Sequence, residues 1–105
     1  DAAPSTIEVL PEIVDVVGDR ATVMIDSGFS NGLDVMKGLA LGAKFVFCGR
    51  AFMWGLGALG LTGPGHVADM LSSELELQLI QLGCSDTNDL DRSWLSGAHR
   101  EWPQN

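Results

Sequence analysis

Two short polar turns in this chain of 105 residues carry the side chains best suited to bind a ligand. The first, Asp26 to Gly32, combines two glycines, two serines, an amide and a carboxylate just before an expected helix. The second is the pair Gly49-Arg50. Backbone N–H groups of glycine-rich turns at helix N-termini bind anions, and arginine presents a planar set of donors that matches phosphate oxygens. Together the turns predict a site for a phosphate-bearing ligand.

Each turn also has a plain structural explanation when it is taken alone. Asp26-Ser27-Gly28 has the composition of an ordinary turn that caps a helix. Arg50 could instead form a solvated ion pair with Asp26 or Glu74. The prediction of a ligand site therefore rests on the two turns occurring together, each at the end of an expected buried strand.

The acidic composition argues against several classes of partner. The sequence has 14 acidic and 6 basic residues, which gives a formal net charge of −8. A nucleic-acid-binding surface needs clustered positive charge, and so does binding to an anionic membrane. We therefore expect no nucleic-acid partner. No apolar run approaches the roughly 18–20 residues of a membrane-spanning helix.

The cysteines and the first residues bear on location and completeness. Cys48 and Cys84 are too few for a disulfide framework, and their surroundings predict no metal site. A reducing, cytoplasmic location fits this usage, and no signal peptide is visible. Because Asp1-Ala2-Ala3-Pro4 lacks an initiator methionine and has the composition of a loop, we expect the chain to be part of something longer.

Alternating helices and strands are expected to position the two turns. The apolar spacing and the capping residues predict a helix from Ser5 or Thr6 to about Val17 and a second one opened by Asn31. Short β-branched and aromatic runs predict buried strands, and a long helical region follows the second strand. The remaining expected ranges are a strand at 21–25, a helix that stops at Gly42, a strand at 45–48 and a clear helix from Val67 to Leu82.

Both expected strands are apolar throughout, which is typical of a parallel sheet covered by helices on both faces. Two strands alone would leave exposed edges and an uncovered apolar face. The chain therefore needs partners, and the simplest is the rest of its own domain. We predict that residues 1–84 are part of one α/β domain and that residues 85–105, which are polar and acidic, form a tail over its surface.

The order and spacing of three motifs resemble a known family. The motifs are the turn Asp26-Ser27-Gly28-Phe29-Ser30, the helix end Ala40-Leu41-Gly42-Ala43 and the pair Gly49-Arg50. Over roughly residues 4–90 the chain is similar to the C-terminal part of the FMN-dependent α-hydroxy acid dehydrogenases and oxidases. That family includes L-lactate dehydrogenase, mandelate dehydrogenase, glycolate oxidase and lactate oxidase.

The resemblance implies the C-terminal portion of a (β/α)8 TIM barrel that binds FMN. The chain would supply helix 6, strand 7, helix 7, strand 8 and helix 8, well under half of a barrel of about 250 residues. By the family pattern Gly49 and Arg50 hold the phosphate of FMN. The ribityl-phosphate side of the cofactor would be lined by Asp26, Ser27, Gly28 and the backbone of Phe29.

Two departures from the family pattern matter. The family usually has an arginine that contacts the phosphate where this chain has Ser30, so FMN is expected to bind more weakly, by about 1–2 kcal/mol, or the site has adapted to another ligand. The family's Asn-His-Gly-Gly-Arg motif is absent, and the chain has no tyrosine. His66 and His99 are expected to be structural or solvated, and no residue of this chain is assigned a catalytic role.

The resemblance implies an oxidoreductase that converts an (S)-2-hydroxy acid, such as L-lactate, mandelate or glycolate, to the 2-oxo acid. This segment would hold the FMN phosphate, the remainder of the barrel would lie on a second chain, and the assembly would be a homo-oligomer. The location would be cytoplasmic, with membrane association left open. Two alternatives remain: a non-catalytic barrel fragment that serves as a structural or interaction module, and an isomerase that uses reduced FMN.

Overall fold

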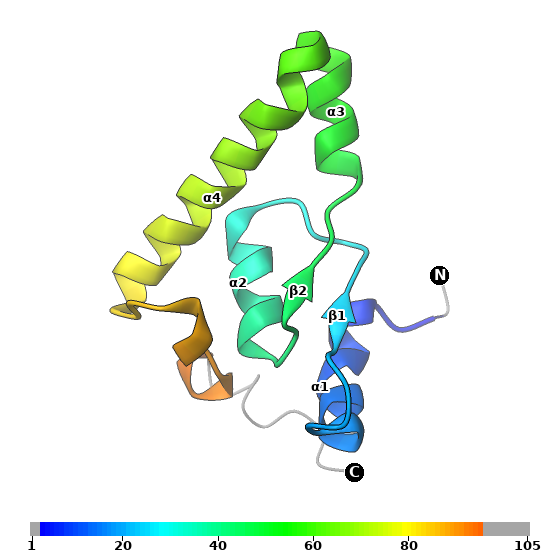
Figure 1. Ribbon diagram of the computed structural model, residues 1–105, viewed down its shortest axis with the longest axis vertical. Coiled ribbons are helices and arrows are strands. Elements are labelled where there is room, and N and C mark those ends of the chain that lie inside the picture. The colour runs from blue at the N-terminus through cyan, green and yellow to red at the C-terminus, as the bar shows by residue number, and fades with distance from the viewer. Residues whose placement is uncertain (1–2, 96–105) are drawn as a thin grey trace.

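The fold alternates helices with two short strands, and a pair of helices and a segment of short turns follow the second strand (Figure 1). It comes from a computed structural model that describes residues 3–95. The helices and strands are α1 (Thr6–Val17), β1 (Met24–Ile25), α2 (Gly32–Ala40), β2 (Phe45–Val46), α3 (Arg50–Leu59) and α4 (Gly63–Leu82). Short 3-10 turns occupy Gly60–Thr62, Thr87–Asp89 and Arg92–Trp94.

Strands β1 and β2 form a parallel pair, as the sequence predicts. Met24 lies opposite Phe45 and Ile25 opposite Val46. The Phe47 N–H donates to the carbonyl oxygen of Ile25 at 2.8 Å, which extends the pairing by one residue. Both strands are shorter than predicted, because an extended segment is a strand only where a neighbour pairs with it.

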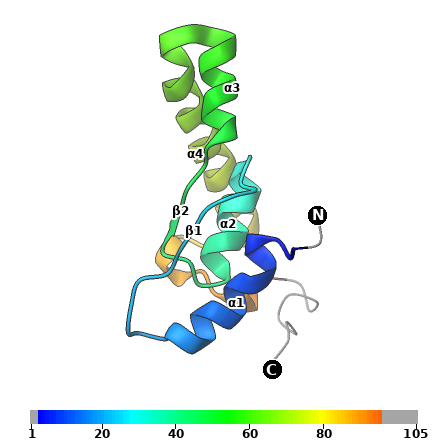
Figure 2. The same cartoon turned by 90° about the vertical axis from the view of Figure 1, so that its right-hand side faces the viewer.

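One face of this sheet is bare within residues 3–95. Figure 2 shows α1 and α2 on the same side of the two strands. Ile25 points toward the helices and is 5% exposed, whereas Met24, Phe45 and Phe47 are 56%, 53% and 46% exposed. The uncovered apolar face that the sequence predicts for two strands alone is therefore confirmed in the described part of the chain, where helices cover only one face. A continuous apolar strand requires cover on each face but does not specify that both covers are helices.

The helix starts predicted at Ser5 and Asn31 are confirmed. The Glu8 carboxylate accepts a hydrogen bond from the Ser5 N–H at 2.8 Å at the start of α1. The Asn31 side chain accepts from the Asp34 N–H at 2.8 Å and caps α2. Gly83 adopts a left-handed conformation with φ of 81° and ends α4, because glycine reaches this region at no steric cost.

The long helical region is a hairpin of two helices. Gly60, with φ of 68°, ends α3, and α4 begins at Gly63 rather than Val67 because Pro64 fits the first turn of a helix. The two helices meet at Gly55 and Gly63, where any side chain on Gly63 would overlap the carbonyl oxygen of Gly55. Because Gly55 and Gly63 have no side chains, α3 and α4 can pack this closely.

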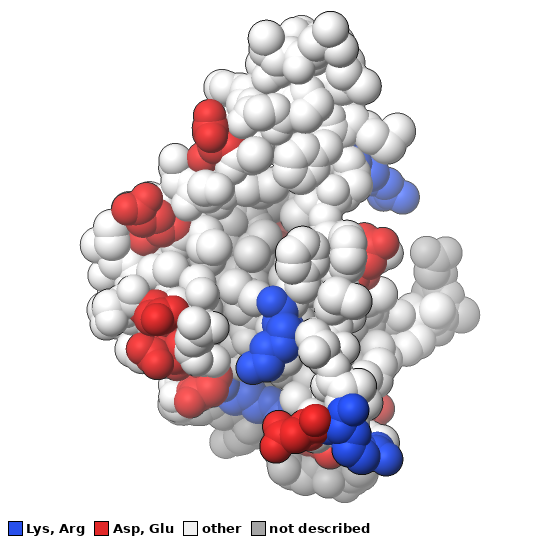
Figure 3. All heavy atoms as spheres, viewed as in Figure 1, with Lys and Arg blue, Asp and Glu red and all other residues white. Residues whose placement is uncertain are grey.

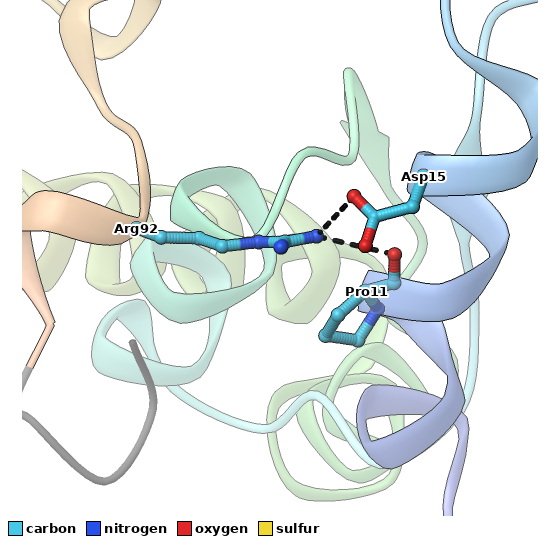
Figure 4. Close-up of polar contacts among 3 residues, drawn as sticks. All are labelled: Pro11, Asp15 and Arg92. Atoms are coloured by element: carbon cyan, nitrogen blue, oxygen red, sulfur yellow. Dashed lines mark hydrogen bonds and ion pairs between the residues drawn. The ribbon is translucent and has the colours of Figure 1, made fainter. Parts of the chain in front are cut away.

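The segment that follows α4 is packed into the fold as far as Leu95. Leu90 and Leu95 are 8% and 7% exposed and belong to the same buried cluster as Leu10. The Arg92 guanidinium donates to the Pro11 carbonyl oxygen at 3.1 Å and to the Asp15 carboxylate at 3.0 Å (Figure 4). We call residues 84–95 the C-terminal strap. The expected surface tail therefore contributes to the core up to Leu95.

The domain boundary at residue 84 stays a prediction. Residues 96–105, with His99 and Trp102, lie outside the described residues. Within the described part, no helix is long and apolar enough to cross a membrane.

Candidate functional site

A cavity of about 520 Å³ lies at the carboxyl ends of β1 and β2. It brings the two polar turns together. The first turn ends at Gly32, and the second ends at Arg50, 18 residues further along the chain. Its lining residues are Asp26, Ser27, Gly28, Phe29, Ser30, Phe47, Gly49, Arg50 and Trp54. All seven residues that the sequence singled out are in this set. Their roles toward a ligand stay predictions.

The first turn has an unusual backbone held from two sides. Ser27 and Gly28 both have positive φ, 83° and 87°. The Asp26 carboxylate accepts from the Ser27 N–H at 2.7 Å, and the Thr6 hydroxyl donates to the Ser27 carbonyl oxygen at 3.0 Å. The Phe29 side chain is 6% exposed and anchors the turn in the core. No heavy atom lies within 4 Å of the position of a side chain on Gly28, so the turn is open there.

We predict that Ser27→Gly stabilises the fold. A left-handed conformation costs a non-glycine residue about 1–2 kcal/mol, and part of the gain is offset because glycine is freer in the unfolded chain. The free energy of unfolding should rise by about 0.5–1 kcal/mol on these principles, as measured by urea denaturation. A decrease in the free energy of unfolding would mean that the Ser27 side chain stabilises the turn by more than its left-handed backbone conformation costs.

The N-terminus of α2 is occupied by carboxylates and is not open to an anion. Asp34 accepts from the N–H and the hydroxyl of Ser30 at 3.2 and 3.3 Å. Glu74, on α4, accepts from the Gly32 N–H at 3.3 Å. Gly32 must be glycine for this approach, since any side chain would overlap the backbone of Leu75. The expectation that the first turn presents its N–H groups to a phosphate is therefore wrong for Ser30 and Gly32.

The N-terminus of α3 is the available anion-binding element. Within residues 3–95, the N–H groups of Gly49 and Arg50 meet no acceptor, and the Arg50 guanidinium forms no hydrogen bond or ion pair. The alternative in which Arg50 pairs with Asp26 or Glu74 is not what the structure shows. Both Gly49 and Arg50 are exposed at the cavity, and no atom crowds Gly49. The positive end of the helix dipole and the arginine thus favour an anion at the same place.

Two aromatic side chains in the lining were missed from the sequence. Trp54 follows Arg50 by one helical turn, so both lie on one face of α3. Phe47 precedes Gly49 by two residues and follows Phe45 on the same side of the chain, with the two phenyl rings 4.8 Å apart. Helical and strand periodicity from Gly49-Arg50 would have identified both.

The carboxylates at the strand ends create a negative potential around Cys48. Burial, followed by the charges of Asp26 and Asp34, raises the pKa of the Cys48 thiol above its ordinary value. Both cysteines are free, and Cys84 is buried.

We predict that alkylation of Cys48 has a midpoint at higher pH than that of an unperturbed thiol, because only the thiolate reacts. Asp26→Asn should lower the midpoint without normalising it, since burial is the larger cause. Iodoacetamide labelling across pH, resolved by peptide mass spectrometry, separates Cys48 from Cys84. A midpoint unchanged by Asp26→Asn would contradict the assigned influence of that carboxylate.

The charges of the cavity fit a phosphorylated polyol. Among the described lining residues, Arg50 is the cation and Asp26 the carboxylate. Arg50 and the start of α3 suit a phosphate. Asp26 uses one oxygen for the Ser27 N–H, which leaves its other oxygen to accept from a hydroxyl group. The residues present therefore fit a ligand with a phosphate at one end and hydroxyl groups beside it.

The described residues supply no metal centre at this cavity. Residues 3–95 contain no group of three or more His, Cys, Asp or Glu side chains that could hold a metal ion. His66 is exposed and lines a separate groove of about 310 Å³ between α3 and α4. That groove shares Ser30 and Trp54 with the cavity, but His66 itself does not line the cavity.

Fold and site together define an α/β protein with a cavity at the carboxyl ends of parallel strands, lined by Arg50 and the start of α3. A family model described as FMN-dependent dehydrogenase matches residues 1–97. The chain belongs to this family, whose members are FMN flavoproteins. The predicted family and cofactor class are thereby confirmed.

The most informative relatives are hydroxy acid oxidases. The chain is 41% identical over 95 residues to L-lactate oxidase of Nostoc sp., which covers 90% of this chain and 26% of that protein. It is 43% identical over 93 residues to 2-hydroxyacid oxidase 1 of Homo sapiens, with coverage of 89% and 25%. The chain thus spans about a quarter of the length of these relatives.

A solved structure of (S)-mandelate dehydrogenase has the same arrangement of elements. Its TM-score to this chain is 0.86 at 43% identity, and the match covers 91% of this chain and 27% of that one. This neighbour is a TIM-barrel flavoenzyme. The coarse fold prediction, an α/β part of such a barrel, is therefore confirmed.

Proposed function

We propose that this chain is the part of a 2-hydroxy acid oxidoreductase that holds the phosphate of FMN, and that the whole protein oxidises an (S)-2-hydroxy acid to the 2-oxo acid. The single observation that carries the proposal is that Arg50, on the wall of the cavity at the N-terminus of α3, has no protein partner within residues 3–95. In the barrel, the described elements would be helix 6, strand 7, helix 7, strand 8 and helix 8, with α3 inserted after strand 8.

Each lining residue has a distinct part in this proposal. Gly49 and Arg50 would bind the phosphate through backbone N–H groups and the guanidinium. Asp26 would accept a hydrogen bond from a ribityl hydroxyl. Gly28 would let the ligand approach the backbone, and Phe29 would keep the turn in register with the core.

The reaction class follows from the cofactor and the relatives. FMN, when bound, takes up the two electrons removed from the substrate. L-lactate oxidase, 2-hydroxyacid oxidase and (S)-mandelate dehydrogenase support a small 2-hydroxy acid as the substrate. The described lining residues include no histidine or lysine, and we propose that the group that accepts the hydroxyl proton comes from residues outside this set.

The phosphate-binding role can be tested directly by amide NMR. Adding FMN to the full chain should shift the amide resonances of Gly49, Arg50 and Gly28. Riboflavin, which lacks the phosphate, should leave Gly49 and Arg50 unmoved at the same concentration. Equal shifts with both flavins, or no shift with either, would overturn the proposal.

Ser30→Arg is expected to tighten FMN binding about tenfold, because it adds a second cation and a charge-assisted hydrogen bond worth about 1.5–3 kcal/mol, less the loss of the Ser30–Asp34 contacts. Riboflavin affinity should change less than twofold. Parallel titrations followed by flavin fluorescence give both constants. Ser30→Gln, which is long and uncharged, is the matched control and should not tighten FMN binding.

A further inference from the structure

The peptide group between Ser27 and Gly28 is held from the start of α1. The Thr6 hydroxyl donates to the Ser27 carbonyl oxygen at 3.0 Å, across 21 residues of sequence. Thr6 is the first residue of α1, and the hydrogen bond from the Ser5 N–H to the Glu8 carboxylate fixes that end of the helix. The hydroxyl of Thr6 is therefore presented to the first turn by a well-fixed element.

This contact sets the orientation of the peptide group. In a planar trans peptide the C=O and the N–H point in opposite directions, so the Gly28 N–H points away from Thr6. Gly28 lines the cavity, and its N–H meets no acceptor within residues 3–95. The orientation therefore leaves the Gly28 N–H available to a ligand in the cavity.

Other N–H groups of the same turn are already occupied. The Asp26 carboxylate accepts from the Ser27 N–H, and the Asp34 carboxylate accepts from the Ser30 N–H. No heavy atom lies within 4 Å of the position of a side chain on Gly28. Because nothing in the described part of the chain crowds that position, a ligand can approach the backbone there.

The turn keeps this orientation against the preference of its own backbone. Ser27 has a φ of 83°, a conformation that a non-glycine residue keeps only where its surroundings fix it. If the peptide rotated, the Ser27 carbonyl oxygen would take the place of the Gly28 N–H. A carbonyl oxygen repels a phosphate, whereas backbone N–H groups bind one.

We propose that Thr6 is a positioning residue for the phosphate of the ligand. Its hydroxyl holds the Ser27–Gly28 peptide so that the Gly28 N–H, and not the Ser27 carbonyl oxygen, faces the phosphate. The inference rests on the function proposed above. It adds a residue of α1 that does not itself line the cavity, and it gives the phosphate a contact from the first turn as well as from Arg50.

The test compares two substitutions of Thr6 by amide NMR and flavin fluorescence. Thr6→Val keeps the shape of the side chain but removes the hydroxyl, and Thr6→Ser keeps the hydroxyl. Inorganic phosphate should shift the Gly28 amide resonance, and Thr6→Val should need about three to ten times more phosphate, as expected for the loss of one hydrogen bond. FMN affinity should fall by the same factor and riboflavin affinity by less than twofold. Thr6→Ser should restore the original values.

Thr62→Val is the matched control. The Thr62 hydroxyl also donates to a backbone carbonyl oxygen, that of Leu59, at 3.1 Å. Thr62 does not line the cavity and belongs to the tip of the α3–α4 hairpin, an upper region of the surface without charged side chains (Figure 3). This variant should keep its affinity for phosphate and FMN within twofold. Circular dichroism shows whether each variant is folded, and Thr6→Ala remains decisive if Thr6→Val is not.

The outcomes separate this inference from the proposed function. A Gly28 resonance that phosphate does not shift, an equal response in Thr6→Val and the original protein, or equal losses of FMN and riboflavin affinity would each overturn the role of Thr6. Lower stability in urea with unchanged phosphate affinity would also overturn it, since Thr6 would then support only the fold. A phosphate response of Gly28 that depends on Thr6, in a protein that binds FMN no better than riboflavin, would support the positioning role and overturn the proposed function.

Discussion

Replacing Arg50 with glutamine should weaken FMN binding about 10- to 100-fold, because a hydrogen bond to a charged group contributes about 1.5–3 kcal/mol. Within residues 3–95, Arg50 has no protein partner, so the substitution removes a ligand contact without breaking an ion pair. Riboflavin, which has no phosphate, should bind the variant as it binds the original chain. Fluorescence titrations of the chain and of the variant with both flavins measure the two effects.

Arg20→Gln is the matched control for this experiment. The Arg20 guanidinium donates to the carbonyl oxygens of Val16 and Val17 at the end of α1, at 2.8 and 3.2 Å. It does not line the cavity, so the same change of charge there should leave FMN affinity within twofold. If Arg50→Gln weakened riboflavin as much as FMN, the phosphate would not be the group that Arg50 binds. Salt should weaken FMN binding to the original chain more than to the variant.

Gly63→Ala should lower the free energy of unfolding by about 1–3 kcal/mol, the usual range for overpacking. The added methyl would overlap the carbonyl oxygen of Gly55. This neighbour is backbone inside another helix and cannot turn away as a side chain would. Helices α3 and α4 must then separate, which moves Trp54 at the wall of the cavity. Urea denaturation monitored by circular dichroism gives the stability change.

Gly65→Ala provides the control in the same helix. No heavy atom lies within 4 Å of a side chain at Gly65, and alanine favours helix over glycine by about 0.5–1 kcal/mol. This variant should be unchanged or more stable. Gly63→Ala should therefore be less stable than Gly65→Ala, although the two variants have identical chemistry and lie two residues apart. A Gly63→Ala chain as stable as the original would show that α3 and α4 can separate at little cost.

The parts of the fold that follow from local chemistry were predictable from the sequence. Asn31 marks a helix start because its side chain accepts from a nearby backbone N–H. Gly83 marks a helix end because, without a side chain, it adopts a left-handed conformation at no steric cost. The pairing of the strands was predictable as parallel because both are apolar runs that alternate with helices. The strand lengths were not, since they depend on neighbours that the described chain does not contain.

The candidate site shows the same division. The two turns were found from their glycines, serines and arginine. The sequence did not reveal that carboxylates occupy the start of α2 while the start of α3 is open. The reason is that the carboxylate of Glu74 reaches the start of α2 from 42 residues away in the sequence. Ser30 stands where the family usually has an arginine that contacts the phosphate, yet its hydroxyl already donates to Asp34. Phe47 and Trp54 were overlooked because aromatic residues on apolar elements are more often core residues than parts of a site.

The C-terminal strap has a consequence for the order of events during synthesis. Arg92 contacts Asp15 across a separation of 77 residues, and Leu90 and Leu95 join the buried cluster that contains Leu10. A ribosome makes α1 before it makes the residues that complete the packing of this helix. Contacts this distant in sequence close large loops and slow folding. Until those residues are made, part of the apolar side of α1 therefore stays exposed. We expect a chaperone to bind the nascent chain at that stage.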